Sequence, residues 1–284
     1  MIVTMGKFIC GMMGMLALAG VARATQTRTA LHYTGYTHGL RVMSFSVDLS
    51  RSNHAYQVGV EYHTTGLYGL FFPVEREITA SGAETAAGPR PDRFEINGEA
   101  RGHIYHAILH FGAGEPQVDN ESPPQDDDDA ADQFQPMPAG VAIDSTDHVS
   151  AVLGLLRKEA RSGRCDADVH VFDGRMLTGL HAATAPDETL VAEHGSSFAG
   201  MAHKCIFTGA VLAGGPKPTA SDDNEQQERL REKQPSTGAA WIAPVGPNGQ
   251  MELVRVAFTT PSGSLVTLYL DKAQPEPIMA ASNQ

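Results

Sequence analysis

The chain has 284 residues, of which 42% are hydrophobic, and its formal net charge at pH 7 is -12. This length and apolar content suit one large β domain or two small ones. The acidic charge is poorly matched to the phosphates of nucleic acids and to anionic lipid head groups, so we expect no nucleic-acid partner and no electrostatic docking to a membrane.

The first 24 residues have the pattern of a secretory signal peptide. Lys7 gives a positive start, an apolar or glycine run extends from Phe8 to Ala19, and an A-x-A cleavage site ends at Ala24. The run is too short to span a bilayer, and no later apolar run approaches transmembrane length. We therefore expect cleavage between Ala24 and Thr25 and an exported chain without a transmembrane segment. Cys10 is not followed by a lipobox, so we expect no lipid anchor.

Short strands are predicted for the first half of the mature chain. Apolar residues alternate with polar ones from Leu40 to Val47, and Tyr56 to Tyr62 keeps a period of two. This alternation points one face of each strand toward a core. An apolar patch, Leu67 to Phe72, follows, and it suits either core packing or an exposed contact surface.

A turn and a further strand are predicted after residue 90. Phe94 and Ile96 lead into Asn97-Gly98, a typical turn signal. Arg101 to Phe111 then alternates again, with Ile104, His106, Ile108 and His110 on one face and Tyr105, Ala107 and Leu109 on the other.

Two polar segments interrupt this pattern, at about residues 112–140 and 214–238. The first contains four consecutive aspartates, Asp126 to Asp129. A calcium site needs oxygen ligands that are spaced around a turn, whereas adjacent aspartates repel one another. We expect a mobile acidic loop in the first segment and a polar insert in the second.

One long helix is predicted between the two segments. Thr146 or Asp147 can cap its start, an apolar stripe runs from Val149 to Leu156, and Gly163 ends it after several cationic residues. We expect the stripe to pack on the concave side of the sheet.

The rest of the chain is predicted to return to strands. Asp173-Gly174 between two alternating runs, Asp168 to Phe172 and Arg175 to Ala182, indicates a hairpin. Met201 to Leu212 alternates less cleanly. The closing strands are expected at Ala239 to Ala243, Leu253 to Thr259 and Leu265 to Leu270. The predicted fold is therefore mainly β: a single domain over residues 25–284 with a curved antiparallel sheet, or incomplete barrel, packed against one long helix.

Cys165 and Cys205 are the two cysteines of the mature chain. They could ligate a metal or form a redox pair, but neither C-x-x-C spacing nor a histidine pair at finger spacing accompanies them. In an oxidising compartment a structural disulfide is the favoured interpretation.

Several of these segments together resemble a known family. They are the opening Tyr36 to Leu40, the helix start at Thr146 to Ser150, the hairpin Val171 to Arg175, and Cys205 after Gly200 to Lys204, with Cys165 before the hairpin. The arrangement resembles the exported proteobacterial family known as domain of unknown function 3108. The resemblance implies a periplasmic protein with a strongly curved antiparallel sheet, similar to the half-barrels of periplasmic lipoprotein carriers and envelope-integrity proteins. It brings no established activity and no catalytic residues.

The sequence contains only weak matches to catalytic motifs. Twelve histidines suggest a metal, yet on a strand only His106 and His110 share a face, while His194 and His203 lie near Cys205 in sequence. Gly195 to Ala199 resembles a nucleophile elbow, but its last glycine is replaced and no helix follows.

Asp173 and Arg175 could also form a site, although a turn aspartate and an exposed strand arginine explain them more simply. No nucleotide-binding motif is present, so we expect no cofactor.

The sequence thus favours a non-catalytic periplasmic protein of the cell envelope that binds a hydrophobic ligand, such as a lipid, or an envelope protein in its curved sheet. Two alternatives stay open. One is a metal-assisted hydrolase that uses histidines such as His106 or His194. The other is a structural component of an envelope complex. The oligomeric state is not predicted.

Overall fold

A computed structural model describes residues 27–71, 73–100, 103–122, 135–215, 236–245, 249–260 and 263–275. The predicted signal peptide, with its cleavage site at Ala24 and Thr25, lies outside the described residues, as do Asp126 to Asp129 and most of the second polar insert. Neither described helix is long and apolar enough to cross a membrane.

Most of the described chain forms one antiparallel sheet of 13 strands. The first seven strands are β1 (Thr27–Thr37), β2 (Leu40–Arg51), β3 (Ala55–Thr64), β4 (Val74–Glu84), β5 (Pro89–Ala100), β6 (His103–His110) and β7 (Gln117–Ser122). The other six are β8 (Ala167–Phe172), β9 (Leu177–Leu190), β10 (Gly200–Ala213), β11 (Ser236–Val245), β12 (Gln250–Thr259) and β13 (Leu265–Pro275). The helices are α1 (Gly66–Phe71) and α3 (His148–Ser162).

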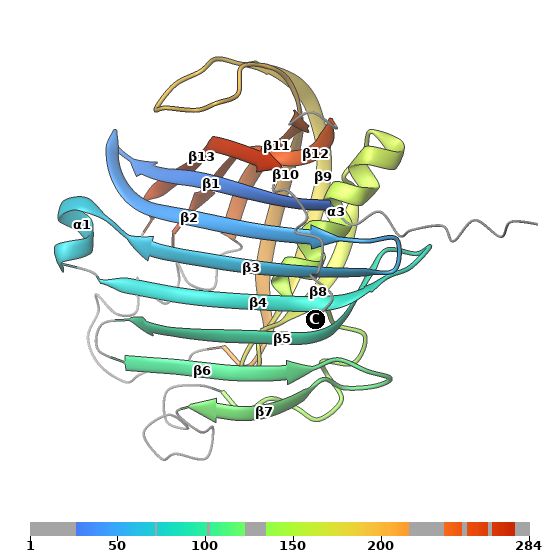
Figure 1. The fold of residues 1–284 in the computed structure, drawn as a ribbon. Coiled ribbons are helices and arrows are strands. Elements are labelled where there is room, and N and C mark those ends of the chain that lie inside the picture. The colour runs from blue at the N-terminus through green and yellow to red at the C-terminus, as the bar shows by residue number, and fades with distance from the viewer. Residues whose placement is uncertain are drawn as a thin grey trace, which may run out of the picture.

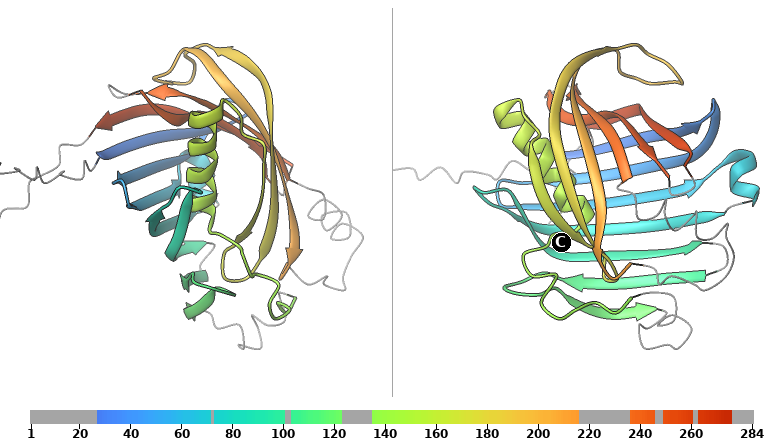
Figure 2. Two further views of the ribbon diagram at one scale, coloured as in Figure 1. Left: turned by 90° about the vertical axis from the view of Figure 1, so that its right-hand side faces the viewer. Right: turned by 180° about the vertical axis from the view of Figure 1, so that it is seen from behind.

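The sheet is strongly curved but open. Its order is β7-β6-β5-β4-β3-β2-β1-β13-β12-β11-β10-β9-β8. Strands that follow each other in sequence therefore pair, except β7 and β8, and β1 also pairs with β13. Strands β7 and β8 are therefore the two edges. Figures 1 and 2 show the two halves of the sheet bending toward each other around α3. The predicted mainly β fold, an incomplete barrel with one long helix, is confirmed.

Side chains fill part of the space between the two halves. A buried cluster joins Phe94 and Leu109 of β5 and β6 to Phe172 and Leu177 of β8 and β9. The inner faces near the two edges thus pack on each other although β7 and β8 share no ladder. This burial removes apolar surface from water, which is the dominant stabilising contribution in such a core.

Helix α3 lies between the two halves of the curved sheet (Figure 2). Asp147 caps its start by accepting a hydrogen bond from the backbone N–H of Ser150 at 2.8 Å, and Gly163 ends it with a left-handed φ of 64°. Both predicted ends are confirmed. Leu153 packs against Leu49 and Val58 on one half of the sheet.

The second half of the sheet contacts the same helix. Leu156 of α3 packs against Ala240 and Ile242 of β11 and against the disulfide between Cys165 and Cys205. The helix therefore buries its stripe against both halves, as an amphipathic helix in a curved sheet must.

The turn predicted at Asn97-Gly98 is wrong, because both residues lie inside β5. At Gly98 the strand packs closely against β4. A Cβ at this position would lie 2.4 Å from the backbone oxygen of Glu75 and 2.6 Å from Cγ of Arg76. A glycine inside a strand commonly marks such a close approach of the neighbouring chain.

The apolar patch after residue 66 begins as a helix. Residues 66–71 form α1, which connects β3 to β4 and projects from one end of the sheet (Figure 1). It has no buried residue, so its apolar side chains are not part of the core.

Three further points of the sequence analysis need correction. The loop expected over residues 112–140 contains the edge strand β7, which pairs with β6 through residues such as Val118 opposite Leu109. Strand β1 was not predicted, because Thr27–Thr37 is largely polar; only one of its faces, with Leu31 and Tyr33, enters the core. The end of the second insert, Ser236 to Gly238, belongs to β11.

Candidate functional site

Five residues form a continuous row across the inner face of β2 to β6. Phe45 pairs with Tyr62, Tyr62 with Arg76, Arg76 with Gly98, and Gly98 with Tyr105. Residues directly opposite each other on neighbouring strands lie on the same face of a sheet. We call this set the inner row.

The inner row lies on the face that α3 covers, but at the other end of the strands. Alternation along β2 places Phe45 on the same face as Leu49, which packs against α3. In Figure 1, α3 crosses the sheet near the end of β2 that contains Leu49, and α1 lies at the opposite end. The row is next to the α1 end, beyond the contacts of α3.

The apolar part of the inner row is an aromatic pair. The rings of Phe45 and Tyr62 stack with centroids 4.9 Å apart and planes at 20°. Both side chains are half-buried. Burial raises the pKa of the Tyr62 hydroxyl, and the positive charge of Arg76 acts in the opposite direction. Phe45 also packs against the buried cluster that contains Leu31 and Trp241, so the pair lies on the concave face at the margin of the core.

The polar part of the inner row is a cation on an aromatic ring. The guanidinium carbon of Arg76 lies 5.7 Å from the centre of the Tyr105 ring. The Nε of Arg76 is buried and has no hydrogen-bond partner among the described residues. A buried unpaired donor on a charged group costs free energy, so a ligand that accepted this hydrogen bond would be favoured there.

A second cation reaches the same ring from the other half of the sheet. The guanidinium carbon of Arg175 lies 5.0 Å from the Tyr105 ring centre, and the Tyr105 hydroxyl donates to the backbone oxygen of Asp173 at 3.3 Å. Asp173 Oδ1 accepts from the backbone N–H of Arg175 at 2.9 Å and of Met176 at 2.7 Å. The predicted turn role of Asp173 is confirmed, but Arg175 is a half-buried turn residue rather than an exposed strand residue.

Exposed apolar side chains surround the α1 end of the sheet. On α1, Leu67, Leu70 and Phe71 are 70%, 77% and 74% exposed. The neighbouring turns add more, and we call the whole set the apolar rim: Leu40, Leu67, Tyr68, Leu70, Phe71, Ile104 and Leu265. Exposed apolar side chains gathered at one place mark interaction sites more often than single ones do. The sequence patch Leu67 to Phe72 is therefore exposed as far as it is described.

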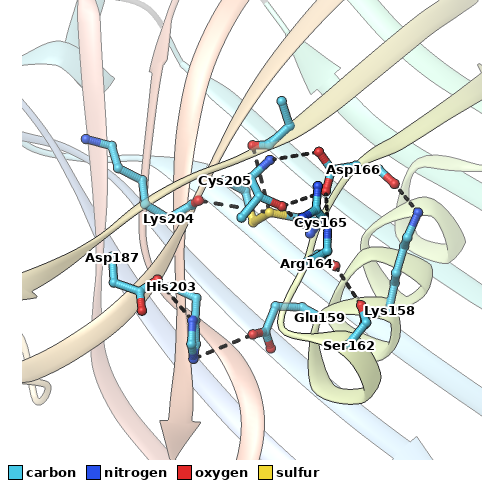
Figure 3. The surroundings of a disulfide bond; sticks show 12 residues. Lys158, Glu159, Ser162, Arg164, Cys165, Asp166, Asp187, His203, Lys204 and Cys205 are labelled. Atoms are coloured by element: carbon cyan, nitrogen blue, oxygen red, sulfur yellow. Dashed lines mark hydrogen bonds and ion pairs between the residues drawn. A yellow bond between two sulfur atoms is a disulfide. The ribbon is translucent and has the colours of Figure 1, made fainter.

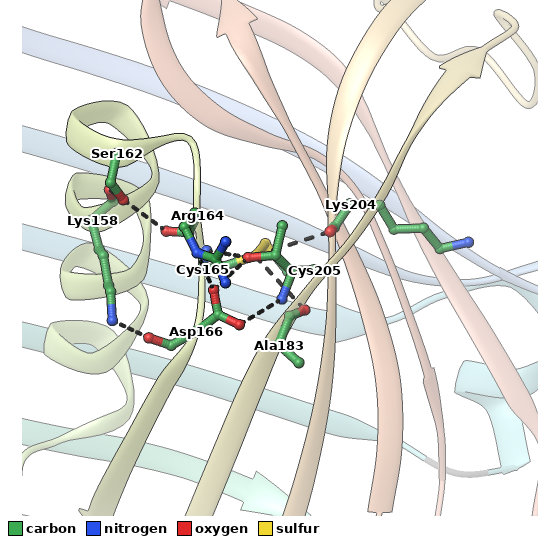
Figure 4. Close-up of polar contacts among 9 residues, drawn as sticks. Lys158, Ser162, Arg164, Cys165, Asp166, Ala183, Lys204 and Cys205 are labelled. Carbon is green, nitrogen blue, oxygen red and sulfur yellow. Dashed lines mark hydrogen bonds and ion pairs between the residues drawn. A yellow bond between two sulfur atoms is a disulfide. The ribbon is translucent and has the colours of Figure 1, made fainter.

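Cys165 and Cys205 form a disulfide (Figure 3). Cys165 lies between α3 and β8, so the bond links the connection after the helix to β10 rather than two strands to each other. Around it, Asp166 Oδ2 accepts from the hydroxyl of Thr184 at 2.7 Å, which is the main reason that the pKa of Asp166 falls to about 2. Figure 4 shows these contacts on the side of α3. The disulfide and the hydrogen bonds around it have a structural role, because they hold the end of α3 against the sheet.

Beside the disulfide, one histidine lies between two carboxylates (Figure 3). His203 Nδ1 is 3.1 Å from Asp187 Oδ1, and its Nε2 is 3.7 Å from Oε1 of the buried Glu159 of α3. Burial raises the pKa of Glu159, while His203 acts to lower it. The arrangement joins α3 to β10, and Glu159 is closed to solvent, so we interpret it as a structural contact.

The histidines named from sequence lie apart. His106 contacts Asn97, His110 contacts Asp119, and His194 packs on Tyr36 with ring centroids 4.6 Å apart and planes tilted by 36°. In the described part of the chain no three histidine, cysteine or acidic side chains are placed to hold a metal ion.

The serines of the elbow-like segment donate to backbone oxygens. Ser196 Oγ donates to Phe198 and Ser197 Oγ to Leu270, at 3.2 and 3.0 Å. Strand β10 follows at Gly200 rather than a helix, which does not fit a nucleophile elbow.

A cavity of about 870 Å³ lies at the end of the sheet away from α1. It is lined by residues that include Ser52, His54 and Asp92. Ser52 Oγ donates to the backbone oxygen of Ala55 at 3.2 Å and accepts from the N–H of His54, so it shapes the β2–β3 turn. Nothing in this arrangement activates the serine.

Comparison with known proteins identifies no family for this chain. No family model matches the chain, and neither does any curated protein. Among solved structures, the chain is similar to a β-barrel-like protein of domain of unknown function DUF1849 from Brucella abortus. The TM-score is 0.49 and the identity 10%, over 88% of this chain and 98% of the other. Membership of domain of unknown function 3108 stays a prediction.

Proposed function

We propose that this chain is a non-catalytic protein of the cell envelope that binds a hydrophobic ligand on the inner face of its curved sheet. The observation that carries the proposal is the stacked pair of Phe45 and Tyr62, half-buried on the concave face beyond the reach of α3. Aromatic surface in a concave site with a few polar groups is typical of small-molecule binding.

The apolar rim supports the same proposal. Residues of the inner row lie near the strand ends that carry Leu40 and α1. A ligand that leaves the row toward this end would meet apolar side chains instead of water, and each square ångström removed from water contributes about 25 cal/mol. A chain-like apolar ligand therefore suits the site better than a compact one.

The periplasm is the compartment that we propose. Two sequence features support it, the leader before Thr25 and two mature cysteines placed for a disulfide, which persists in oxidising compartments. The proposed location and the proposed ligand are independent, and each can fail alone.

A metal-assisted hydrolase is the rival proposal, and the described residues favour it less. His106 and His194 lie on different elements with different partners, Asn97 for the first and Tyr36 for the second. Binding needs only the surfaces already in place, whereas hydrolysis needs a group of ligands or an activated nucleophile.

Fluorescence of N-phenyl-1-naphthylamine, an uncharged apolar probe, tests the binding proposal on the mature protein. We expect saturable binding that weakens roughly tenfold in Tyr62→Ala, because one buried aromatic contact contributes about 1.5–3 kcal/mol. The matched control is Glu61→Ala, since Glu61 neighbours Tyr62 but is exposed on the other face. Circular dichroism checks that both variants fold.

Absence of probe binding by the folded wild-type protein would make the proposal wrong and favour a structural component of an envelope complex. Equal weakening in both variants would place the probe elsewhere. Mass spectrometry of lipid that co-purifies with the periplasmic protein would then identify the ligand class.

A further inference from the structure

We propose that Arg76 receives the anionic head group of an acyl-chain amphiphile whose tail lies on Phe45 and Tyr62. The inference rests on the proposed function and narrows it from any hydrophobic ligand to one with a carboxylate or phosphate head. It follows from the composition of the inner row, which places a cation next to the stacked aromatic pair.

Several arginines of the described residues pair with carboxylates. Glu84 pairs with Arg157 at 2.6 Å, Glu95 with Arg93 at 2.7 Å, and Glu193 with Arg255 at 2.8 Å.

Arg76 has no carboxylate partner among the described residues, and its Nε is buried without a hydrogen bond. Its flanking acids, Glu75 and Glu77, are exposed on the other face of β4, as strand alternation requires. A guanidinium presents a planar fork of donors that matches a carboxylate or a phosphate.

The surroundings of Arg76 concentrate positive charge. Arg175 lies on the same Tyr105 ring, so two guanidinium groups contact one side chain, at 5.7 and 5.0 Å from its centre. Asp173, the carboxylate of the turn that contains Arg175, accepts two backbone hydrogen bonds through Oδ1. An anion placed at Arg76 would offset this local charge.

The geometry of the row sets the length of the ligand. Arg76 pairs directly with Tyr62, and Tyr62 stacks on Phe45, so a head group at Arg76 leaves the aromatic pair for the first part of a tail. Strands lie about 4.8 Å apart, and the guanidinium of Arg76 reaches over β5 toward Tyr105. A tail from this guanidinium to Phe45 therefore crosses at least two strand spacings, which correspond to roughly eight methylene groups. The end of a longer chain would reach toward the apolar rim.

The overall charge makes the inference testable. The chain carries a net charge of -12, which repels anions in general. A preference for an anionic amphiphile over a neutral one of the same length therefore requires a local cationic site.

The experiment measures how laurate, dodecyl phosphate and dodecanol displace N-phenyl-1-naphthylamine from the mature protein. We expect both anions to displace the probe at roughly tenfold lower concentration than dodecanol, because only the anions form charge-assisted hydrogen bonds with the guanidinium. Arg76→Met should abolish the preference for the anions over dodecanol, with each displacement measured relative to the probe affinity of the same variant. Arg76→Lys should keep part of it, and Arg90→Met, at an exposed arginine of β5, should keep all of it.

The outcomes separate the two proposals. No probe binding by wild-type protein would overturn the proposed function. Probe binding with equal displacement by laurate and dodecanol, or a preference that survives Arg76→Met, would overturn only the assignment of Arg76. A preference for one anion identifies the source of the head group, a fatty acid for laurate and a phospholipid for dodecyl phosphate.

Discussion

The side chain of Arg76 lies directly against the Cα of Gly98 on the next strand. A Cβ at position 98 would be 2.6 Å from Cγ of Arg76, closer than real Cβ atoms come to other heavy atoms. The glycine therefore leaves the space through which Arg76 passes toward Tyr105, and it links the backbone of β5 to the geometry of the proposed site.

Gly98→Ala should consequently destabilise the protein. The methyl group would also meet the backbone oxygen of Glu75 at 2.4 Å, which cannot move without disturbing the β4–β5 ladder. Overpacking of this kind costs about 1–3 kcal/mol. Gly59→Ala on β3 is the matched control, since a Cβ there would meet nothing within 4 Å. Urea unfolding measures both; equal stability of the two variants would contradict the prediction.

Much of this fold is predictable from local signals. The caps of α3 at Asp147 and Gly163 and the Asp173-Gly174 hairpin follow from short-range chemistry that the rest of the fold does not alter. The two faces of β6 follow equally well, with Ala107 and Leu109 fully buried and their neighbours more exposed.

The inner row could not be predicted, because it depends on register. Tyr62 and Tyr105 are recognisable as inward residues from alternation, but nothing local aligns them with Arg76 across three ladders. The turn prediction at Asn97-Gly98 failed for a related reason. A glycine that favours a turn also permits close packing inside a strand. The one sequence signal for this close packing was Gly98 itself, a glycine within an alternating segment.

Loss of the disulfide should weaken the attachment of α3 to the sheet. The bond between Cys165 and Cys205 closes a segment with a sequence separation of 40 residues. In the chain-entropy account, such a closure contributes about 4 kcal/mol to the free energy of unfolding. We expect the double variant Cys165→Ser, Cys205→Ser to lose about this amount in urea unfolding. Thiol labelling of unfolded, unreduced mature protein should find no free thiol, and two labelled thiols would contradict the bond.

The apolar rim should contribute to binding of other apolar surfaces and little to the free energy of unfolding. Leu70 and Phe71 are 77% and 74% exposed, so Leu70→Ser with Phe71→Ser should change the free energy of unfolding by only about 0.5 kcal/mol. The same variant should elute earlier from a hydrophobic-interaction column. Met201→Ser, at an exposed apolar residue on β10 outside the rim, is the control and should shift elution less. Strong destabilisation by the α1 variant would show that α1 packs on the core.

The buried carboxyl group of Glu252 should make stability depend on pH. Its side chain is 3% exposed, and burial raises its pKa from 4.5 to about 7, with Arg51 acting weakly in the opposite direction. Because the folded protein holds this proton more tightly than the unfolded chain does, the stabilisation is complete below pH 4.5. It is lost as the pH rises to about 7.

Glu252→Gln removes this dependence, since the amide does not ionise. From the difference in pKa, we expect the variant to gain about 3 kcal/mol over the wild type at pH 8 and to lose that advantage near pH 5. Urea unfolding at several pH values measures the difference, and Glu77→Gln, at an exposed position of β4, is the control that should show no trend. A difference between wild type and Glu252→Gln that stays constant from pH 5 to pH 8 would contradict the titration of Glu252 in this range, because a shifted pKa can act on stability only where the proton is released.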